Sequence, residues 1–213
     1  MNESSTTAPG KQEWVYSDLR AQLESGRRRP GDRLVIAQLA EEFGISVIPV
    51  REAIRRLEAE GWVTFRAHVG AEVAGISRED WAAAAELLAV LEGQATALAA
   101  PLLSRDEVAE LRALNARMES ALGAGDIVAF LALNRAFHGR ICNRCGNGWL
   151  TRMIDEIQPR FEALGPTSIR PRTRAVLAEH DELIALIERG ADASAIEAAA
   201  RRHKLNTLAS YNA

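Results

Sequence analysis

Cysteine is scarce in this chain, which has two, Cys142 and Cys145, among 213 residues. A framework of disulfide bonds, such as holds small secreted domains together, needs more cysteines than this. The Cys-x-x-Cys spacing also occurs in redox pairs and in half zinc sites, but no second pair exists and no strand-then-helix pattern surrounds this one. We therefore interpret both residues as reduced thiols, which suits a protein of the reducing cytoplasm.

Long apolar runs are also lacking. The richest stretch, 81–100, is interrupted by Glu86 and Glu92, so the sequence predicts no membrane-spanning helix and no membrane partner. The N-terminus has neither the basic start nor the apolar core of an export signal, and we expect 1–10 to be a flexible tail. A net charge of −3 gives no general attraction to nucleic acid, although clusters of arginine can supply one locally.

What the chain does contain is a helix-turn-helix pattern that begins at residue 36. A short amphipathic segment, 36–43, is interrupted by Gly44, and Ser46 and Pro49 mark the first turn of the next helix, with Ser46 as its N-cap. In this second helix, apolar residues recur at i, i+3, i+4 and i+7, which predicts one buried face. They are Val50, Ala53, Ile54 and Leu57. The outward positions are Val47, Ile48, Arg51, Glu52 and Arg55.

A small β-hairpin follows this pair of helices. Residues 63–66, 67–70 and 71–74 have the pattern of strand, turn and strand, and 29–34 could add a third short strand ahead of the helices. Helix, strand, two helices and a two-stranded wing is the order of a winged helix-turn-helix. We predict this domain over 11–76.

Beyond Gly75 the sequence is rich in alanine and leucine, with helical periodicity and almost no strand signal. It predicts six helices, at 78–100, 104–123, 126–144, 148–164, 171–189 and 192–210. Ser104, followed by Glu107, is placed to cap the second of them. Short connections favour an antiparallel bundle over 77–213. The expected fold is mainly α, an N-terminal winged helix-turn-helix plus a C-terminal antiparallel six-helix bundle.

Three of the four histidines fall in the predicted bundle, each in a different helix: His138, His180 and His203. Asn134 precedes His138 by four residues, so the two side chains share one helix face. A single helical histidine is in most cases an ordinary core or surface residue. Facing helices that each contribute such side chains can, however, build a metal site in the centre of a bundle.

Residues 11–76 resemble the DNA-binding domain of the GntR family of bacterial regulators, in 30–32, 39–41, the run 49–61 and the wing glycine Gly70. The resemblance implies binding to double-stranded operator DNA. The chain departs from the family at Val47 and Ile48, where the family usually has Arg and then Thr. These apolar side chains either touch a thymine methyl group or pack inside the protein.

Arg51 matches an arginine of the family and is our best candidate for contact with a base or a phosphate. Phosphates or the minor groove are the expected partners of Arg33, Arg55, His68 and the backbone at Gly70, and such contacts fix register more than sequence. The full set of expected DNA-binding residues is Arg33, Ser46, Val47, Ile48, Arg51, Arg55, His68 and Gly70.

Residues 77–213 resemble the FCD effector domain of the FadR branch of the GntR family, and the number of helices resembles its VanR-type subgroup. The matching pieces are the run 134–138, Gly146 with Asn147, Glu179 with His180, and His203. In that family an Asp or Asn and three His bind a divalent metal ion. The resemblance implies metal ligation by Asn134, His138, His180 and His203. The Arg of the family's Arg-x-x-Leu-Glu motif is replaced by Leu88.

An Asn ligand has a chemical consequence, because a neutral amide oxygen leaves the double positive charge of the ion uncompensated. The ion should bind less tightly than with Asp, and it should attract an anion more strongly. We therefore expect an effector with a carboxylate that completes the coordination shell. Imidazole and oxygen ligands are compatible with zinc, nickel, iron or manganese.

Taken together, these features predict a homodimeric, cytoplasmic, metabolite-responsive transcription regulator and not an enzyme. Two winged helices would bind the half-sites of a near-palindromic operator, with relief of repression by the effector as the commoner arrangement. Two alternatives stay open. His180 and Asp181 suggest a metal-dependent hydrolase of the helical His-Asp type, but adjacent helical residues point about 100° apart, which leaves no evident general base. The other alternative is a purely structural metal site.

Overall fold

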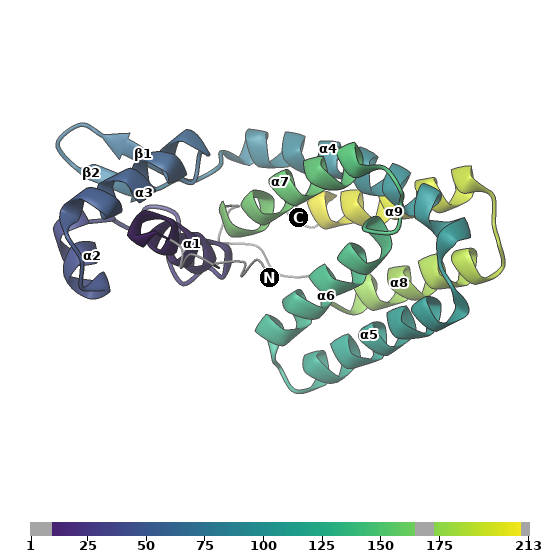
Figure 1. The fold of residues 1–213 in the computed structure, drawn as a ribbon. Coiled ribbons are helices and arrows are strands. Elements are labelled where there is room, and N and C mark those ends of the chain that lie inside the picture. Colours follow the sequence, from purple (N-terminus) through teal and green to yellow (C-terminus); the bar gives the residue numbers. More distant parts are fainter. Residues whose placement is uncertain (1–9, 165–172, 210–213) are drawn as a thin grey trace, which may run out of the picture. The chain divides into compact units, whose positions relative to one another are not determined.

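The computed structural model describes residues 10–164 and 173–209, which form two compact units (Figure 1). The first unit runs to Arg78 and includes the last turns of the helix that ends at Leu164. The second contains Glu79–Gln158 and the two C-terminal helices. The predicted flexible tail, 1–10, lies outside the described residues except for Gly10.

The first unit is built from α1 (Lys11–Glu24), α2 (Ile36–Phe43), α3 (Val47–Ala59), β1 (Val63–Arg66) and β2 (Gly70–Val73) (Figure 1). The two strands are antiparallel, with Val63 opposite Val73. Gly44 ends α2 in the left-handed conformation, with a φ of 63°, which glycine adopts without the steric penalty of a Cβ atom. This is the predicted winged helix-turn-helix.

The buried face of α3 lies at the centre of the core of this unit. Its four apolar residues have no exposed surface, as their spacing predicted: Val50, Ala53, Ile54 and Leu57. Leu19 of α1 and Trp62 after α3 are also fully buried and belong to the same cluster. Because α3 is anchored along this side, its opposite side faces outward in a fixed register.

Two local expectations for this unit are wrong. Ser46 takes the N-cap position of α3, but its side chain makes no capping hydrogen bond. The segment 29–34 forms no strand and pairs with β2 through one isolated bridge, from Arg33 to Glu72. Pro30 and Gly31 explain this second difference, because proline lacks an amide donor and Gly31 is left-handed, with a φ of 89°.

The second unit is helical in the part of the chain that the structure describes. Its elements are α4 (Arg78–Ala99), the short 3-10 helix η1 (Ala100–Leu102), α5 (Arg105–Gly123), α6 (Ile127–Cys142), α7 (Gly148–Leu164) up to Gln158, α8 (Thr173–Glu188) and α9 (Ala193–Ala209). All six predicted helices are present, and the ends that the structure describes lie within two residues of their predicted positions. The predicted helical residues 171, 172 and 210 lie outside the described residues. Ser104 and Glu107 form the predicted capping box of α5. The mainly α fold is confirmed.

The stretch Arg78–Leu102 corrects the expectation that no segment could cross a membrane. It has 25 residues and an apolar window with a mean hydropathy of 1.2, so by length and composition alone it could cross a membrane. Half of that window is buried inside the structure. Buried positions recur along one side of α4, at Trp81, Ala85, Leu88 and Glu92. This is the pattern of a core helix, which passes the same test of length and hydropathy.

α9 passes close to α4 at Gly93. A Cβ atom on this residue would lie 2.6 Å from Cγ of Arg201 and 3.3 Å from the backbone oxygen of Glu197. Such contacts would force the two helices apart. The glycine therefore allows the close packing that carries His203, farther along α9, into the core.

Candidate metal centre and nucleic-acid interface

Three imidazole rings meet in the core of the second unit. His138 of α6, His180 of α8 and His203 of α9 are buried, and their ligand nitrogens lie within 4.8 Å of one another. The Nε2 atom of His138 is 3.4 Å from Nε2 of His180 and 3.1 Å from Nε2 of His203. The structure thus brings together the three histidines that the sequence singled out.

The outer nitrogen, Nδ1, of each ring faces an oxygen acceptor. The acceptors are Oε2 of Glu179 for His203 (2.7 Å), Oδ1 of Asn115 for His180 (3.2 Å) and Oε2 of Glu92 for His138 (3.6 Å). Acceptors in these positions favour the tautomer with its proton on Nδ1, which leaves a lone pair on each Nε2. The three lone pairs are therefore directed into the same small region.

A divalent cation fits this set of donors. Facing lone pairs at 3.1 Å repel each other unless positive charge lies between them. Two nitrogen ligands at the bond length typical of zinc lie about 3.3–3.4 Å apart in a tetrahedral site. Two of the three separations, 3.1 and 3.4 Å, are close to that value, and all three lie within 4.8 Å.

Asn134 lies one helical turn before His138 on α6. Its Oδ1 atom is buried and has no hydrogen-bond partner among the described residues. A buried polar atom without a partner costs roughly 1–3 kcal/mol, a cost that coordination to a cation would remove. This oxygen is the observation that fits Asn134 to the fourth ligand position.

A buried ion pair lies beside the histidines. Nζ of Lys204 in α9 is 2.6 Å from Oε1 of Glu92 in α4, and the two side chains are 7% and 4% exposed. Lys204 also donates to Oε1 of Gln158 in α7, at 3.2 Å. Because the other oxygen of Glu92 faces His138, the pair ties α4 and α9 together at the edge of the cluster.

Burial keeps two of the rings neutral. The pKa of His138 lies well below its ordinary value, first because the ring is buried and then because of the charges of His203, His180 and Lys204. Burial likewise lowers the pKa of His180, with His203 and Lys204 adding to the effect. A neutral imidazole loses no proton when it binds a metal ion, so both rings can act as ligands at neutral pH.

The carboxylates behind the rings were missed from the sequence. Glu92 stood out only as an interruption of an apolar stretch, and Glu179 was named only as the neighbour of His180. In the structure both face imidazoles, so they would offset part of the charge of a bound cation, contrary to the expectation based on the ligands alone. One signal was available for Glu92, because an acid in the middle of an apolar helix is rarely buried without a partner.

The two cysteines take no part in this cluster. Cys142 and Cys145 are free thiols in the apolar core of the second unit. Burial raises the pKa of the Cys142 thiol, which keeps it protonated and unreactive.

The outer face of α3 begins with two apolar side chains, Val47 and Ile48, which are 41% and 68% exposed. The sequence left open whether they pack inside the protein, and this exposure excludes such packing. Ser46, just before them, is exposed, and its hydroxyl is not engaged in capping. In helix-turn-helix proteins, residues at this end of the second helix reach the edges of bases.

The arginines of α3 fall into two groups. Arg51 and Arg55 are exposed, and their side chains make no hydrogen bond or ion pair with other described residues. Arg56 pairs with Glu13 at 2.7 Å and with Glu60 at 3.2 Å. Arg51 and Arg55 are therefore open to DNA, whereas Arg56 stabilises the unit itself.

The turn of the wing presents His68 and Gly70, both exposed. His68 has a φ of 64°, a left-handed conformation that costs roughly 1–2 kcal/mol for a residue with a Cβ atom. Gly70 has a φ of 99°, which favours glycine. The turn thus offers an imidazole and a bare stretch of backbone, the two groups expected to contact DNA.

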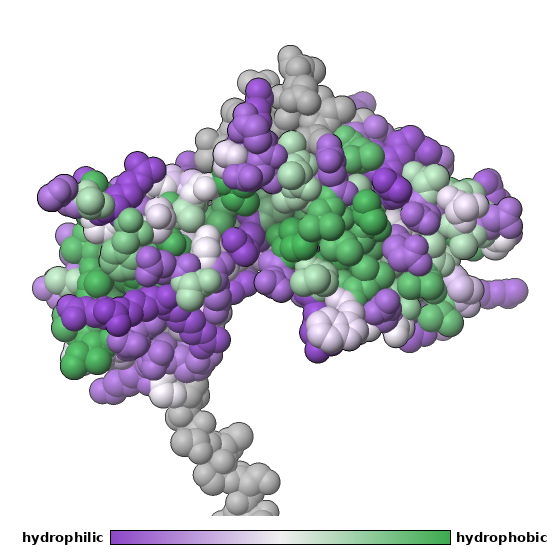
Figure 2. Space-filling model, turned by 90° about the horizontal axis from the view of Figure 1, so that it is seen from above, coloured by the Kyte–Doolittle hydropathy of each residue, from purple (hydrophilic) through white to green (hydrophobic). Residues whose placement is uncertain are grey.

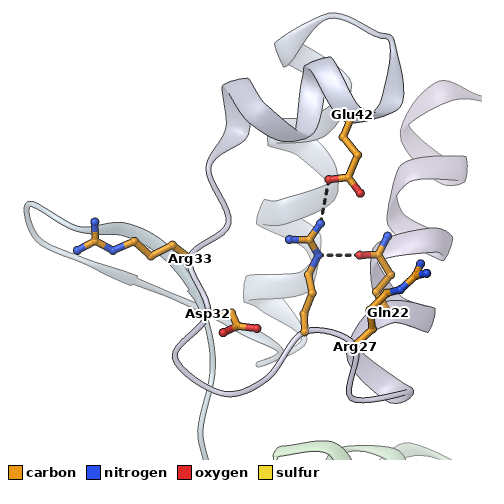
Figure 3. Close-up of a pocket in the computed structure, with 6 residues that line it drawn as sticks. Gln22, Arg27, Asp32, Arg33 and Glu42 are labelled. Carbon is orange, nitrogen blue, oxygen red and sulfur yellow. Dashed lines mark hydrogen bonds and ion pairs between the residues drawn. The ribbon is translucent and has the colours of Figure 1, made fainter.

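Arg33 lies at a polar pocket of about 540 Å³ in the first unit (Figure 3). Inside the pocket, Arg28 donates to Oε1 of Gln22 at 2.7 Å and pairs with Glu42 at 3.0 Å. Figure 3 shows the side chain of Arg33 directed away from these partners. Arg28 is satisfied within the protein, and Arg33 extends outward, where a phosphate could approach.

Both parts of the chain match known families. Residues 11–73 match the family of bacterial regulatory proteins, gntR family, and residues 83–206 match the FCD domain. The chain is 30% identical over 164 residues to the HTH-type transcriptional regulator McbR of Escherichia coli (strain K12), covering 73% of this chain and 74% of McbR. It is 31% identical over 131 residues to a probable D-xylose utilization operon transcriptional repressor of Paenarthrobacter nicotinovorans, covering 62% and 58%.

Solved structures agree with these matches. E. coli McbR/YncC has a TM-score of 0.75 at 25% identity, covering 96% of this chain and 99% of that one. A putative transcriptional regulator GntR from Rhodococcus sp. RHA1 has a TM-score of 0.72 at 18% identity, covering 96% and 97%, which shows a common fold. Membership of the VanR-type subgroup stays a prediction. Because the FCD match alone spans more than half of its length, this chain belongs to the GntR family and is a DNA-binding transcription regulator with an FCD domain.

Proposed function

We propose that this regulator binds a near-palindromic operator as a homodimer, and that a small carboxylate bound at a divalent metal ion in the FCD domain changes its affinity for DNA. The observation that carries the sensing half is the convergence of three buried imidazoles, each with an acceptor behind it. The recognition half rests on the exposed start of α3 and on the open side chains of Arg51 and Arg55.

The ion would be held by the residues that the resemblance implied, Asn134, His138, His180 and His203. A bound divalent cation supplies positive charge and open coordination positions for a carboxylate oxygen. Glu92, Asn115 and Glu179 keep the rings in the ligating tautomer, a role in which such partners strengthen metal binding. Zinc, nickel, iron and manganese all accept nitrogen and oxygen donors of this kind.

A hydrolytic function has less support. A general base must reach the water that it activates. Asp181 accepts a hydrogen bond from Asn115 at 2.8 Å, and Glu179 is bound to the outer nitrogen of His203. Both acids are therefore engaged behind the rings. This placement of the two acids, and the membership of the chain in a family of transcription regulators, favour regulation over catalysis.

A second copy of the chain is the proposed partner of the outer face of α4. Leu87, Val90 and Leu98 lie along this face with exposures of 48%, 43% and 38%, and Leu102 of η1 continues it. Figure 2 shows apolar side chains gathered in one patch on the second unit. An interface of this kind is self-complementary and would give the two recognition helices needed for two half-sites. Because its target is DNA in bacteria, we place the protein in the cytoplasm, without a membrane partner.

Metal content is the first test of the sensing half. The full chain should carry about one divalent ion per subunit, His203→Ala should carry almost none, and Asn134→Ala should carry less than the wild type. His68→Ala is the matched control, because His68 lies on the wing, outside the cluster, and its loss should leave the metal content unchanged. Equal and negligible metal content in all four proteins would rule the site out.

Response to acids is the second test. A gel shift with operator DNA selected by the protein should change on addition of at least one of acetate, succinate, citrate or benzoate, and His203→Ala should abolish that change. A metal-loaded protein whose DNA binding responds to no acid would have a structural metal site instead. Turnover of p-nitrophenyl phosphate by the metal-loaded protein would support the hydrolase.

A further inference from the structure

We propose that Val47 and Ile48 recognise thymine, and that each half-site of the operator carries thymine methyl groups where the first turn of α3 enters the major groove. This inference rests on the proposed operator binding and adds the class of base that the helix selects. Its starting point is that both side chains are exposed at the start of a helix whose other large aliphatic residues, Val50, Ile54 and Leu57, are fully buried.

Folding does not require these two side chains. Val50, Ala53, Ile54 and Leu57 already give α3 a complete buried face. A single exposed apolar residue on a protein surface is common and would carry no conclusion. Two such residues side by side, at the end of the helix that contacts bases, form an apolar surface where the ligand is DNA.

Their neighbours on the helix support this placement. Arg51 follows Val47 by four residues and Ile48 by three, so it lies one turn farther along the same face. Its guanidinium has no partner among the described residues. Arg55 lies one turn farther along, and its guanidinium also has no partner among these residues. The apolar pair therefore lies beside cations that can hold the phosphate backbone, which fixes it against the groove.

The chemistry of the base edges selects thymine. In the major groove thymine alone carries a methyl group, beside its O4 acceptor, whereas the recognisable groups of guanine, adenine and cytosine are all hydrogen-bond donors or acceptors. Valine and isoleucine cannot form hydrogen bonds through their side chains, so they would strip water from those polar edges without replacing it. The same two residues thus favour thymine and disfavour the other bases.

The experiment begins with sites selected from a random DNA pool by the full-length protein. Each thymine in the selected site is then replaced by deoxyuridine, which removes only the methyl group. We expect a loss of about fourfold in affinity at each thymine that meets Val47 or Ile48, the effect of one buried methyl group. Thymines elsewhere in the site should show no loss.

Variants assign the effect to the two side chains. Ile48→Ala and Val47→Ala should each abolish the deoxyuridine penalty at one position, because the shortened side chain no longer reaches the methyl group. Val128→Ala is the matched control, since Val128 is 80% exposed on α6, outside the first unit, and its loss should leave both penalties intact. Arg51→Ala should weaken binding to every sequence and also leave the penalties intact. Circular dichroism checks that each variant is folded.

Two results would overturn the inference, and they are distinguishable from failure of operator binding. One is a selected site in which no replacement of thymine weakens binding, and the other is a penalty that persists in both Ile48→Ala and Val47→Ala. Either would leave specific DNA binding standing. Failure to select any sequence would overturn the proposed operator binding, and this inference with it.

Discussion

Two ion pairs on α9 have the same length and differ in burial. Nζ of Lys204 is 2.6 Å from Glu92, and a guanidinium nitrogen of Arg202 is 2.6 Å from Glu182. The side chains are 7% and 4% exposed in the first pair and 51% and 53% exposed in the second. Removal of one partner from a buried pair leaves a desolvated charge and costs about 3–5 kcal/mol, whereas an exposed pair contributes about 0–1 kcal/mol.

We therefore expect Lys204→Met to lower the free energy of unfolding by about 3–5 kcal/mol and Arg202→Met to lower it by less than about 1 kcal/mol. The assay is urea unfolding followed by circular dichroism, with EDTA present so that bound metal does not contribute. The double variant Glu92→Met/Lys204→Met should recover most of the loss, because apolar side chains fill the space without leaving a charge. Equal losses for Lys204→Met and Arg202→Met, or additive losses in the double variant, would refute this reasoning.

Three further predictions concern the recognition helix, the outer ligand shell and pH. Arg51→Ala should weaken DNA binding and reduce the slope of log affinity against log salt by about one, measured by fluorescence anisotropy. Arg56→Ala should leave this slope unchanged and lower the free energy of unfolding, measured by urea unfolding. Glu179→Gln should reduce metal affinity about 10–100-fold in competition with a chromophoric chelator, because an imidazole loses its charged partner; unchanged affinity would place Glu179 outside the mechanism. The metal-free protein should lose stability as pH falls below about 6.5, by at most about 3 kcal/mol per pH unit, because His138 and His180 take up protons in the unfolded chain but not in the buried core, where their pKa values are lowered. A flat stability profile from pH 7 to 5 would contradict this.

Features set by neighbours in the chain could be predicted from the sequence. The spacing of Val50, Ala53, Ile54 and Leu57 repeats with the helix, so it identified the buried face of α3 correctly. Gly44 marked the break between α2 and α3, where the structure has a left-handed residue. The ends of the helices in the second unit, where the structure describes them, could also be predicted, because polar caps and glycine or proline interrupt their periodicity.

Contacts between residues far apart in the chain could not be predicted in this way. Periodicity places both Arg55 and Arg56 on the exposed side of α3, but only the fold shows that Arg56 meets Glu13, 43 residues earlier. The pairing of Lys204 with Glu92 has the same origin. Ser46 illustrates a different limit, since the sequence pattern of an N-cap fixes the position of the residue and not the direction of its hydroxyl.

The charges around the histidines narrow the expected effector. Two carboxylates face the rings, Glu92 and Glu179, and they contribute two negative charges. Lys204, the ion-pair partner of Glu92, contributes one positive charge. A divalent cation would leave this buried region with one positive charge, which a single carboxylate would neutralise. A second buried carboxylate would remain unpaired, at a penalty of several kcal/mol. We therefore expect an acid that places one carboxylate at the ion, and because the balancing groups come from α4, α8 and α9, its binding would stabilise one arrangement of these helices over others.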